Sequence, residues 1–86
     1  MSANPVRREG IMERQVGDER MLYDAVGRAV HVLNETAYFI WERCDGKHSA
    51  DEIVAEAVQL SDLPEEELRI DVEGCIETFR ALAIVD

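Results

Sequence analysis

The sequence predicts an α+β domain with a winged-helix-like fold, in which a three-stranded antiparallel sheet is followed by three helices. The prediction rests on a change of hydrophobic period along the chain. Residues 11–33 alternate apolar and polar side chains in short runs separated by glycine, as strands and tight turns do. Residues 34–86 instead repeat apolar side chains at helical spacing. The 86 residues allow one domain, which we expect at 11–86 behind a flexible, polar tail at 1–10.

The first two strands are predicted near Ile11–Val16 and at 20–23. Gly17 and Asp18 lie between them, and a Gly-Asp pair between apolar runs indicates a two-residue hairpin turn. A second turn is predicted over 24–28. Because both connections are short, the three strands should form an antiparallel meander.

The third strand is predicted at 29–33. Alternate side chains point to opposite faces of a sheet, so Val30 and Val32 share one face, and the other face carries Ala29, His31 and Leu33. In a meander this strand lies at the edge, where backbone N–H and C=O groups lack partners. Proline or charge usually protects such an edge, and this strand has neither, apart from His31 when it is protonated. We therefore expect the strand to be a template for another chain.

The first helix should begin after Asn34, whose side chain can cap a helix N-terminus, and end at Gly46, which tolerates the left-handed conformation. Ser49 and Glu52 have the spacing of a capping box, which predicts the start of the second helix. We expect Trp41 to anchor the core. The apolar side chains expected on the buried stripes of these helices are Ala37, Ile40, Trp41, Cys44, Ile53, Val54, Ala57 and Leu60.

The third helix should begin near Pro64, because proline is tolerated in the first helical turn, and the glutamates at 65–67 suit the positive end of its dipole. Residues 83–85 could continue this helix or form a short final strand. Gly74 lies off the apolar stripe, although glycine within a helix costs about 1 kcal/mol. The apolar stripe consists of Leu68, Val72, Cys75, Ile76, Phe79 and Leu82.

The net charge of −10 is confined to the helical part of the chain. Residues 1–33 carry five arginines and five acidic residues, whereas 34–86 carry four basic and fourteen acidic residues. Such a surface repels phosphate, so we expect neither nucleic acid nor membrane as a partner. No segment has the length of apolar sequence that spans a bilayer, and the N-terminus lacks a secretory signal, so we expect a cytoplasmic protein.

No residue pattern predicts catalysis or a cofactor. Cys44 and Cys75 fall on apolar helix stripes, where buried free thiols are typical. Cys44 and His48 have a local ligand spacing, but without a C-x-x-C pair we do not expect zinc. The sequence contains no phosphate-binding loop and no recognisable pairing of nucleophile and base. We therefore expect a binding protein rather than an enzyme.

Several pieces of the sequence form one longer pattern. They are Val30-His31-Val32-Leu33-Asn34-Glu35-Thr36-Ala37, Ile40-Trp41, Cys44-Asp45-Gly46, Ser49 with Glu52-Ile53, and downstream Asp71-Val72 with Leu82. Together they resemble the signature of PqqD-like proteins over about residues 5–86. One departure is the lack of the proline-containing stretch that the pyrroloquinoline quinone member often has before its Leu-x-x-x-Ala segment. The departure points away from that pathway, not from the family.

The resemblance implies a precursor-peptide recognition element of ribosomally made, modified peptides. Such a domain binds a leader peptide as an added strand and passes it to a modifying enzyme, commonly a radical S-adenosylmethionine (SAM) enzyme. Carried over to this sequence, the docking strand comprises Ala29, Val30, His31, Val32 and Leu33. The third helix should flank it, and we expect its low-bulk side at Ile70, Asp71, Gly74 and Thr78 to face the peptide. A tolerated surface glycine is the alternative for Gly74, and an ordinary strand residue is the alternative for His31.

Three other functions remain open on the sequence alone. A winged helix could bind DNA as a regulator, but the second helix contains no basic residue to contact phosphates. An acidic acyl carrier needs Asp-Ser-Leu at a helix start, whereas this chain has Ser61-Asp62-Leu63. The open edge strand could instead serve a homodimer or another interaction module.

Overall fold

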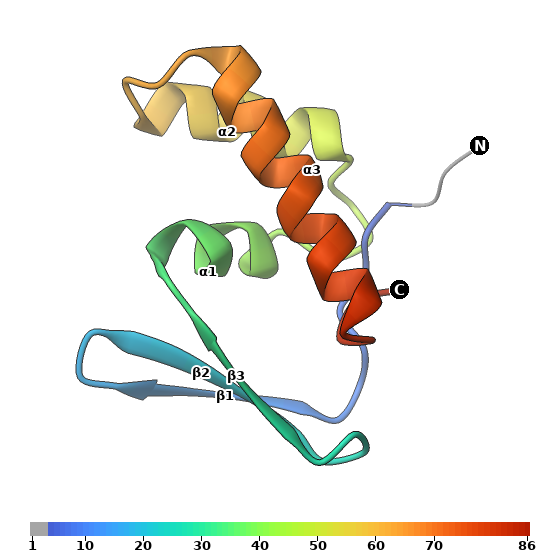
Figure 1. Cartoon of the computed structure of the whole chain (residues 1–86). Coiled ribbons are helices and arrows are strands. Elements are labelled where there is room, and N and C mark those ends of the chain that lie inside the picture. The colour runs from blue at the N-terminus through green and yellow to red at the C-terminus, as the bar shows by residue number, and fades with distance from the viewer. Residues whose placement is uncertain (1–3) are drawn as a thin grey trace.

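The computed structural model describes residues 4–86 and confirms the predicted fold class. Figure 1 shows the sheet at one end of the molecule and α2 at the other, with α1 between them, while α3 runs from the α2 end down past α1. The elements in chain order are β1 (Ile11–Val16), β2 (Glu19–Asp24), β3 (Ala29–Leu33), α1 (Glu35–Glu42), α2 (Ala50–Leu60) and α3 (Glu65–Ala81). No helix within 4–86 combines the length and the apolarity needed to cross a membrane.

The sheet is an antiparallel meander of order β1-β2-β3. Gly17 has a φ of 63°, which the tight turn between β1 and β2 requires and which a glycine adopts without strain. Leu22 and Leu33 point inward and are buried, whereas Val30 and Val32 are more than half exposed. The alternation predicted for the third strand is thus confirmed.

The helices supply most of the core. Trp41 is 1% exposed and packs its ring edge-on against Phe79, with the ring centroids 5.8 Å apart. Asn34 caps α1 by accepting the Ala37 N–H, and Ser49 and Glu52 form the predicted capping box of α2. The other helix residues in this core cluster are Ile40, Ile53, Val54, Val72 and Ile76.

Two apolar residues expected on buried stripes are exposed. Leu60 is 73% exposed and Leu82 is 42% exposed, so their predicted burial is wrong. Leu60 is the last residue of α2, and Leu82 follows the end of α3. Helical periodicity indicates which side of a helix is apolar, but it does not tell how far along that side the neighbouring elements extend.

The two ends of the chain lie beside one another. Val6 forms an isolated bridge with Asp45, and Arg7 forms one with Val85. The N–H groups of Arg7 and Arg8 donate to the carbonyls of Cys44 and Ile84, at 2.8 and 3.0 Å. Part of the segment expected as a flexible tail is therefore hydrogen-bonded, and the predictions for residues 1–3 lie outside the described residues.

The C-terminal residues follow the second of the two predicted alternatives. The third helix ends at Ala81, and Ala83 has a φ of 61°, which turns the chain away from the helix axis. Val85 then bridges Arg7 as a short extended segment. A helix continuing through 83–85 is excluded.

Candidate functional site

The turn between β1 and β2 determines which side of β2 each backbone group faces. Two residues separate Val16 from Glu19, so these two form the hydrogen-bonded pair that closes the hairpin. Bonded and non-bonded pairs alternate along an antiparallel ladder. The backbone N–H and C=O groups of Glu19, and of every second residue after it, therefore point to β1. Those of Arg20, Leu22 and Asp24 point to β3.

The same alternation fixes the free edge of β3. The β3 residues in register with these three β2 residues are Leu33, His31 and Ala29. Their backbone N–H and C=O groups therefore point toward β2. The N–H and C=O groups of Val30 and Val32 point the other way. Within 4–86 no strand or bridge pairs with β3 on that side. Four backbone hydrogen-bonding groups thus face an open edge.

The two edges of the sheet differ in protection. The β1 edge carries Glu13, Arg14 and Gln15, and the Glu13 carboxylate accepts the indole N–H of Trp41. Charged side chains of this kind disfavour strand addition. On the β3 edge, His31 is the one polar residue of the strand, and the other four residues are apolar. An incoming chain therefore meets less protection at β3 than at β1.

The five predicted docking residues of β3 divide between the two faces of the sheet. Val30 and Val32 are 53% and 56% exposed on the outer face, beside Tyr23 and Met21 in register. On the inner face, Ala29 and His31 are half-buried, and Leu33 is buried in the core. The Leu33 side chain is therefore part of the buried core. The side chains of the other four β3 residues remain available to contact a guest peptide.

The predicted residues of α3 form no packed wall against β3. The strand packs on β2 and α1, whereas the helix packs on α2 and α1. Ile70 is 71% exposed, and Gly74 and Thr78 are exposed, with the Thr78 hydroxyl donating to the Gly74 carbonyl at 2.9 Å. Only Asp71 of this set lines a hollow near the strand.

That hollow adjoins the end of β3 and has a volume of about 270 Å³. Sequence reasoning missed it as a unit, although the apolar Leu60 and Leu63 in a polar turn were an available signal. Leu63 is 48% exposed there. The hollow is lined by two acidic residues, Glu35 and Asp71, and by no Lys or Arg. The remaining lining residues are Thr36, Phe39, Ala57, Leu60, Ser61, Leu63 and Leu68.

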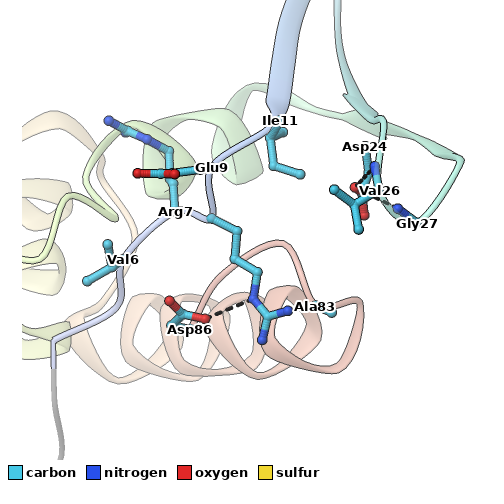
Figure 2. Close-up of a pocket in the computed structure, with 10 residues that line it drawn as sticks. Val6, Arg7, Glu9, Ile11, Asp24, Val26, Gly27, Ala83 and Asp86 are labelled. Atoms are coloured by element: carbon cyan, nitrogen blue, oxygen red, sulfur yellow. Dashed lines mark hydrogen bonds and ion pairs between the residues drawn. The ribbon is translucent and has the colours of Figure 1, made fainter.

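A larger cleft of about 580 Å³ adjoins the start of β3 (Figure 2). It lies between the N-terminal segment, the turn before β3 and the C-terminus. The Asp24 carboxylate shapes the turn by accepting the N–H groups of Val26 and Gly27, at 3.1 and 2.9 Å. Arg8 and Asp86 form an ion pair of 2.8 Å within the cleft. The two hollows therefore adjoin opposite ends of the open strand.

The titratable groups with shifted pKa values belong to the helical part of the chain, and none of them is a residue of the sheet. The hydrogen bond to His48 and the Lys47 N–H lower the pKa of Asp45 to about 2, and the Asp45 carboxylate raises the pKa of His48. Burial raises the pKa of the Cys44 thiol to about 11. No group of three or more His, Cys, Asp or Glu side chains within 4–86 is placed to hold a metal ion. The open backbone groups of β3 suit strand pairing.

Comparison with known proteins gives one family and two similar folds. The model of the family "Coenzyme PQQ synthesis protein D (PqqD)" matches residues 19–85. A solved structure described as "Lasso peptide synthetase B1 complexed with the leader peptide" has a TM-score of 0.86 at 18% identity, covering 98% of this chain and 99% of that one. "TbiB1 in Complex with the TbiA(beta) Leader Peptide" has a TM-score of 0.83 at 12% identity, covering 94% of each chain. No curated protein matches.

Proposed function

The chain belongs to the PqqD family, and from this we propose that it binds the leader segment of a ribosomally made precursor peptide and presents it to a modifying enzyme. The observation that carries the proposal is the open edge of β3. Val30 and Val32 offer unpaired backbone groups there, and strand addition uses such groups for affinity. The two structural neighbours whose descriptions name a leader peptide support it.

We infer that the leader adds as a fourth strand, antiparallel to β3, as in the rest of the sheet. Its N-terminal part would then lie near the hollow at Glu35 and Asp71, and its C-terminal part would leave past Val26 and the cleft of Figure 2. An acidic hollow without a lining cation favours basic residues in the N-terminal part of the guest. The part of the precursor that follows the leader would then extend away from the protein near Val26.

The energetics suit a carrier that must release its cargo. A leader peptide is disordered when free, so ordering it on β3 opposes binding. Micromolar affinity, about −8 kcal/mol, is sufficient for a transient complex. The outer sheet face around Val30 stays available to a second protein while the edge is occupied. We propose a radical SAM enzyme as that second protein, because it is the common partner in the family that the sequence resembles.

The test begins with an mRNA-displayed library of random 15-residue peptides, selected on the immobilised full chain. A selected peptide is then titrated into ¹⁵N-labelled protein while the backbone amide shifts are followed. We expect the largest shifts at Val30 and Val32, with smaller ones around the two hollows. Failure to select any peptide, or shifts concentrated on β1, would contradict the proposal.

Self-association through the same edge is the second candidate, because two copies could pair their β3 strands. Sedimentation velocity of the full chain over a hundredfold range of concentration distinguishes the two. Under the proposed function the chain stays monomeric, and the selected peptide binds in a 1:1 ratio. A dimer that the peptide dissociates would show that the edge serves both purposes.

A further inference from the structure

We propose that His31 is the specificity-determining residue of the β3 edge and that it selects a hydroxyl or carboxamide side chain on the guest peptide. The inference rests on the proposed function and goes further, since it names the chemistry of one leader position. His31 is the only polar side chain within Ala29–Leu33. Backbone pairing at Val30 and Val32 accepts almost any sequence, so discrimination must come from side chains.

The ladder places one guest residue directly across from His31. Val30 and Val32 form the hydrogen-bonded pairs with an antiparallel guest, so the position between them is a non-hydrogen-bonded pair. Such pairs bring the two Cα atoms to about 4.5 Å, closer than bonded pairs. Both side chains then lie on the inner face of the sheet. The guest residue at this position contacts the His31 ring before it contacts any other side chain of β3.

The imidazole of His31 has hydrogen-bonding capacity that the described part of the chain leaves unused. Its Nε2 has less than 1 Å² of accessible surface and no hydrogen-bond partner. The ring shares the inner face with Leu22, its fully buried partner in register, which offers no polar group. Leaving a buried nitrogen unpaired disfavours the free state. A guest side chain that supplies a partner once the His31 ring has turned toward it therefore gains affinity.

The side-chain types that fit are those that both donate and accept. A neutral imidazole has one donor and one acceptor nitrogen, and either can face the guest after a ring rotation. Serine, threonine, asparagine and glutamine match both possibilities. A site that hydrogen-bonds its ligand rejects an isostere lacking that group much more strongly than an apolar pocket rejects an added hydroxyl. The apolar neighbours of His31 on the edge cannot discriminate in this way.

The experiment compares the library selection on the wild-type chain with selections on His31→Leu and His31→Gln. We expect wild type and His31→Gln to enrich hydroxyl or carboxamide residues at one position, flanked by positions that tolerate many residues. His31→Leu should enrich apolar residues at that position and leave the rest of the selected pattern unchanged. Circular dichroism establishes that each variant folds, and His31→Gln supports the argument even if the leucine variant does not fold.

A double-mutant cycle gives the size of the effect. In a peptide selected on wild type, exchanging the central threonine for valine should weaken binding about tenfold on wild type and little on His31→Leu. The His31 ring ¹⁵N shifts should move when the threonine peptide is added. Equal losses on both proteins, or the same selected pattern from all three, would overturn the inference while the proposed function stands. Recovery of no peptide from wild type would overturn both.

Discussion

The strand half and the helical half of this chain differ in how much they contribute to the buried core and in how many backbone groups they leave unpaired. The strands contribute only Leu22 and Leu33 to the buried core, and both edges of the sheet are unpaired within the described residues. From residue 34 onward the chain contributes every other buried hydrophobic residue of the core, including Trp41 and Phe79. The helical half also carries the whole net charge of −10, whereas the five arginines and five acidic residues of 1–33 cancel.

The difference suggests a division of labour between stability and binding. A small domain has little core to spare, and this one concentrates its core where no guest is expected. The sheet keeps one apolar face and one unprotected edge exposed, which costs solubility but leaves the backbone groups of β3 available. Substitutions in the helical core should therefore change stability, and substitutions at the β3 edge should change binding.

The largest expected effect is on stability and lies at Trp41. Replacing Trp41 with alanine removes a fully buried ring that packs on Phe79 and donates to Glu13, so we expect a loss of about 3–5 kcal/mol in the free energy of unfolding. Met12→Ala in the strand half, at 59% exposure, should cost under about 0.5 kcal/mol. Urea denaturation followed by circular dichroism measures both. Comparable losses in the free energy of unfolding for the two variants would mean that stability is not concentrated in the helical half.

The next effect concerns binding and compares the two edges of the sheet. Val32→Pro removes an outward N–H from β3, and Gln15→Pro removes the corresponding outward N–H from β1. Proline is tolerated on edge strands, so both variants should fold. We expect the β3 variant to bind a selected peptide at least about tenfold more weakly, and the β1 variant to bind as wild type does. Fluorescence anisotropy with a labelled peptide measures the affinities.

A control separates the backbone from the side chain at Val32. Val32→Thr keeps the N–H and the branched shape at an exposed position, so its affinity should stay close to that of the wild type. If the threonine variant loses as much peptide affinity as the proline variant, the Val32 side chain and not its backbone N–H carries the interaction. If Gln15→Pro loses more than Val32→Pro, the guest binds at the opposite edge.

The sequence predicted the open edge better than it predicted the surroundings of that edge. Periodicity and turn chemistry are local, so they were enough to give the faces of β3 and its place at the margin of the sheet. The hollow around Leu60 and Leu63 is built by the ends of three helices, and no local pattern specifies where those ends meet. The unpaired nitrogen of His31 depends on what surrounds the ring, which sequence spacing does not show.

The third effect is smaller and lies on α3, within the helical half. A Cβ added at Gly74 would meet no atom within 4 Å, so Gly74→Ala should raise the free energy of unfolding by about 0.5–1 kcal/mol. If the α3 flank also lines the guest's path, Gly74→Leu should weaken peptide binding several-fold while the stability gain persists. Unchanged affinity would assign Gly74 to the solvent-exposed surface and confine binding to the strand half.

The smallest effect is the pH dependence of stability that His48 contributes in the helical half. His48 Nδ1 lies 2.9 Å from the Asp45 carboxylate, which raises the pKa of His48 above 6.5, while the same contact lowers the pKa of Asp45 from 3.8 to about 2. A raised histidine pKa stabilises the fold below pH 6.5, and that contribution is lost as the pH rises through the folded value. The depressed carboxyl pKa stabilises above pH 3.8, and its contribution is lost as the pH falls toward 2.

The contribution of this pair should therefore be fullest between pH 3.8 and 6.5 and decline as the pH rises above 6.5 through the folded pKa of His48. His48→Gln should flatten the decline between pH 6 and 8 in urea denaturation. Both side chains of the His48 pair are partly exposed, so 0.5 M salt should also reduce the decline. If instead the slope survives in His48→Gln, the Asp45–His48 pair does not supply this part of the stability.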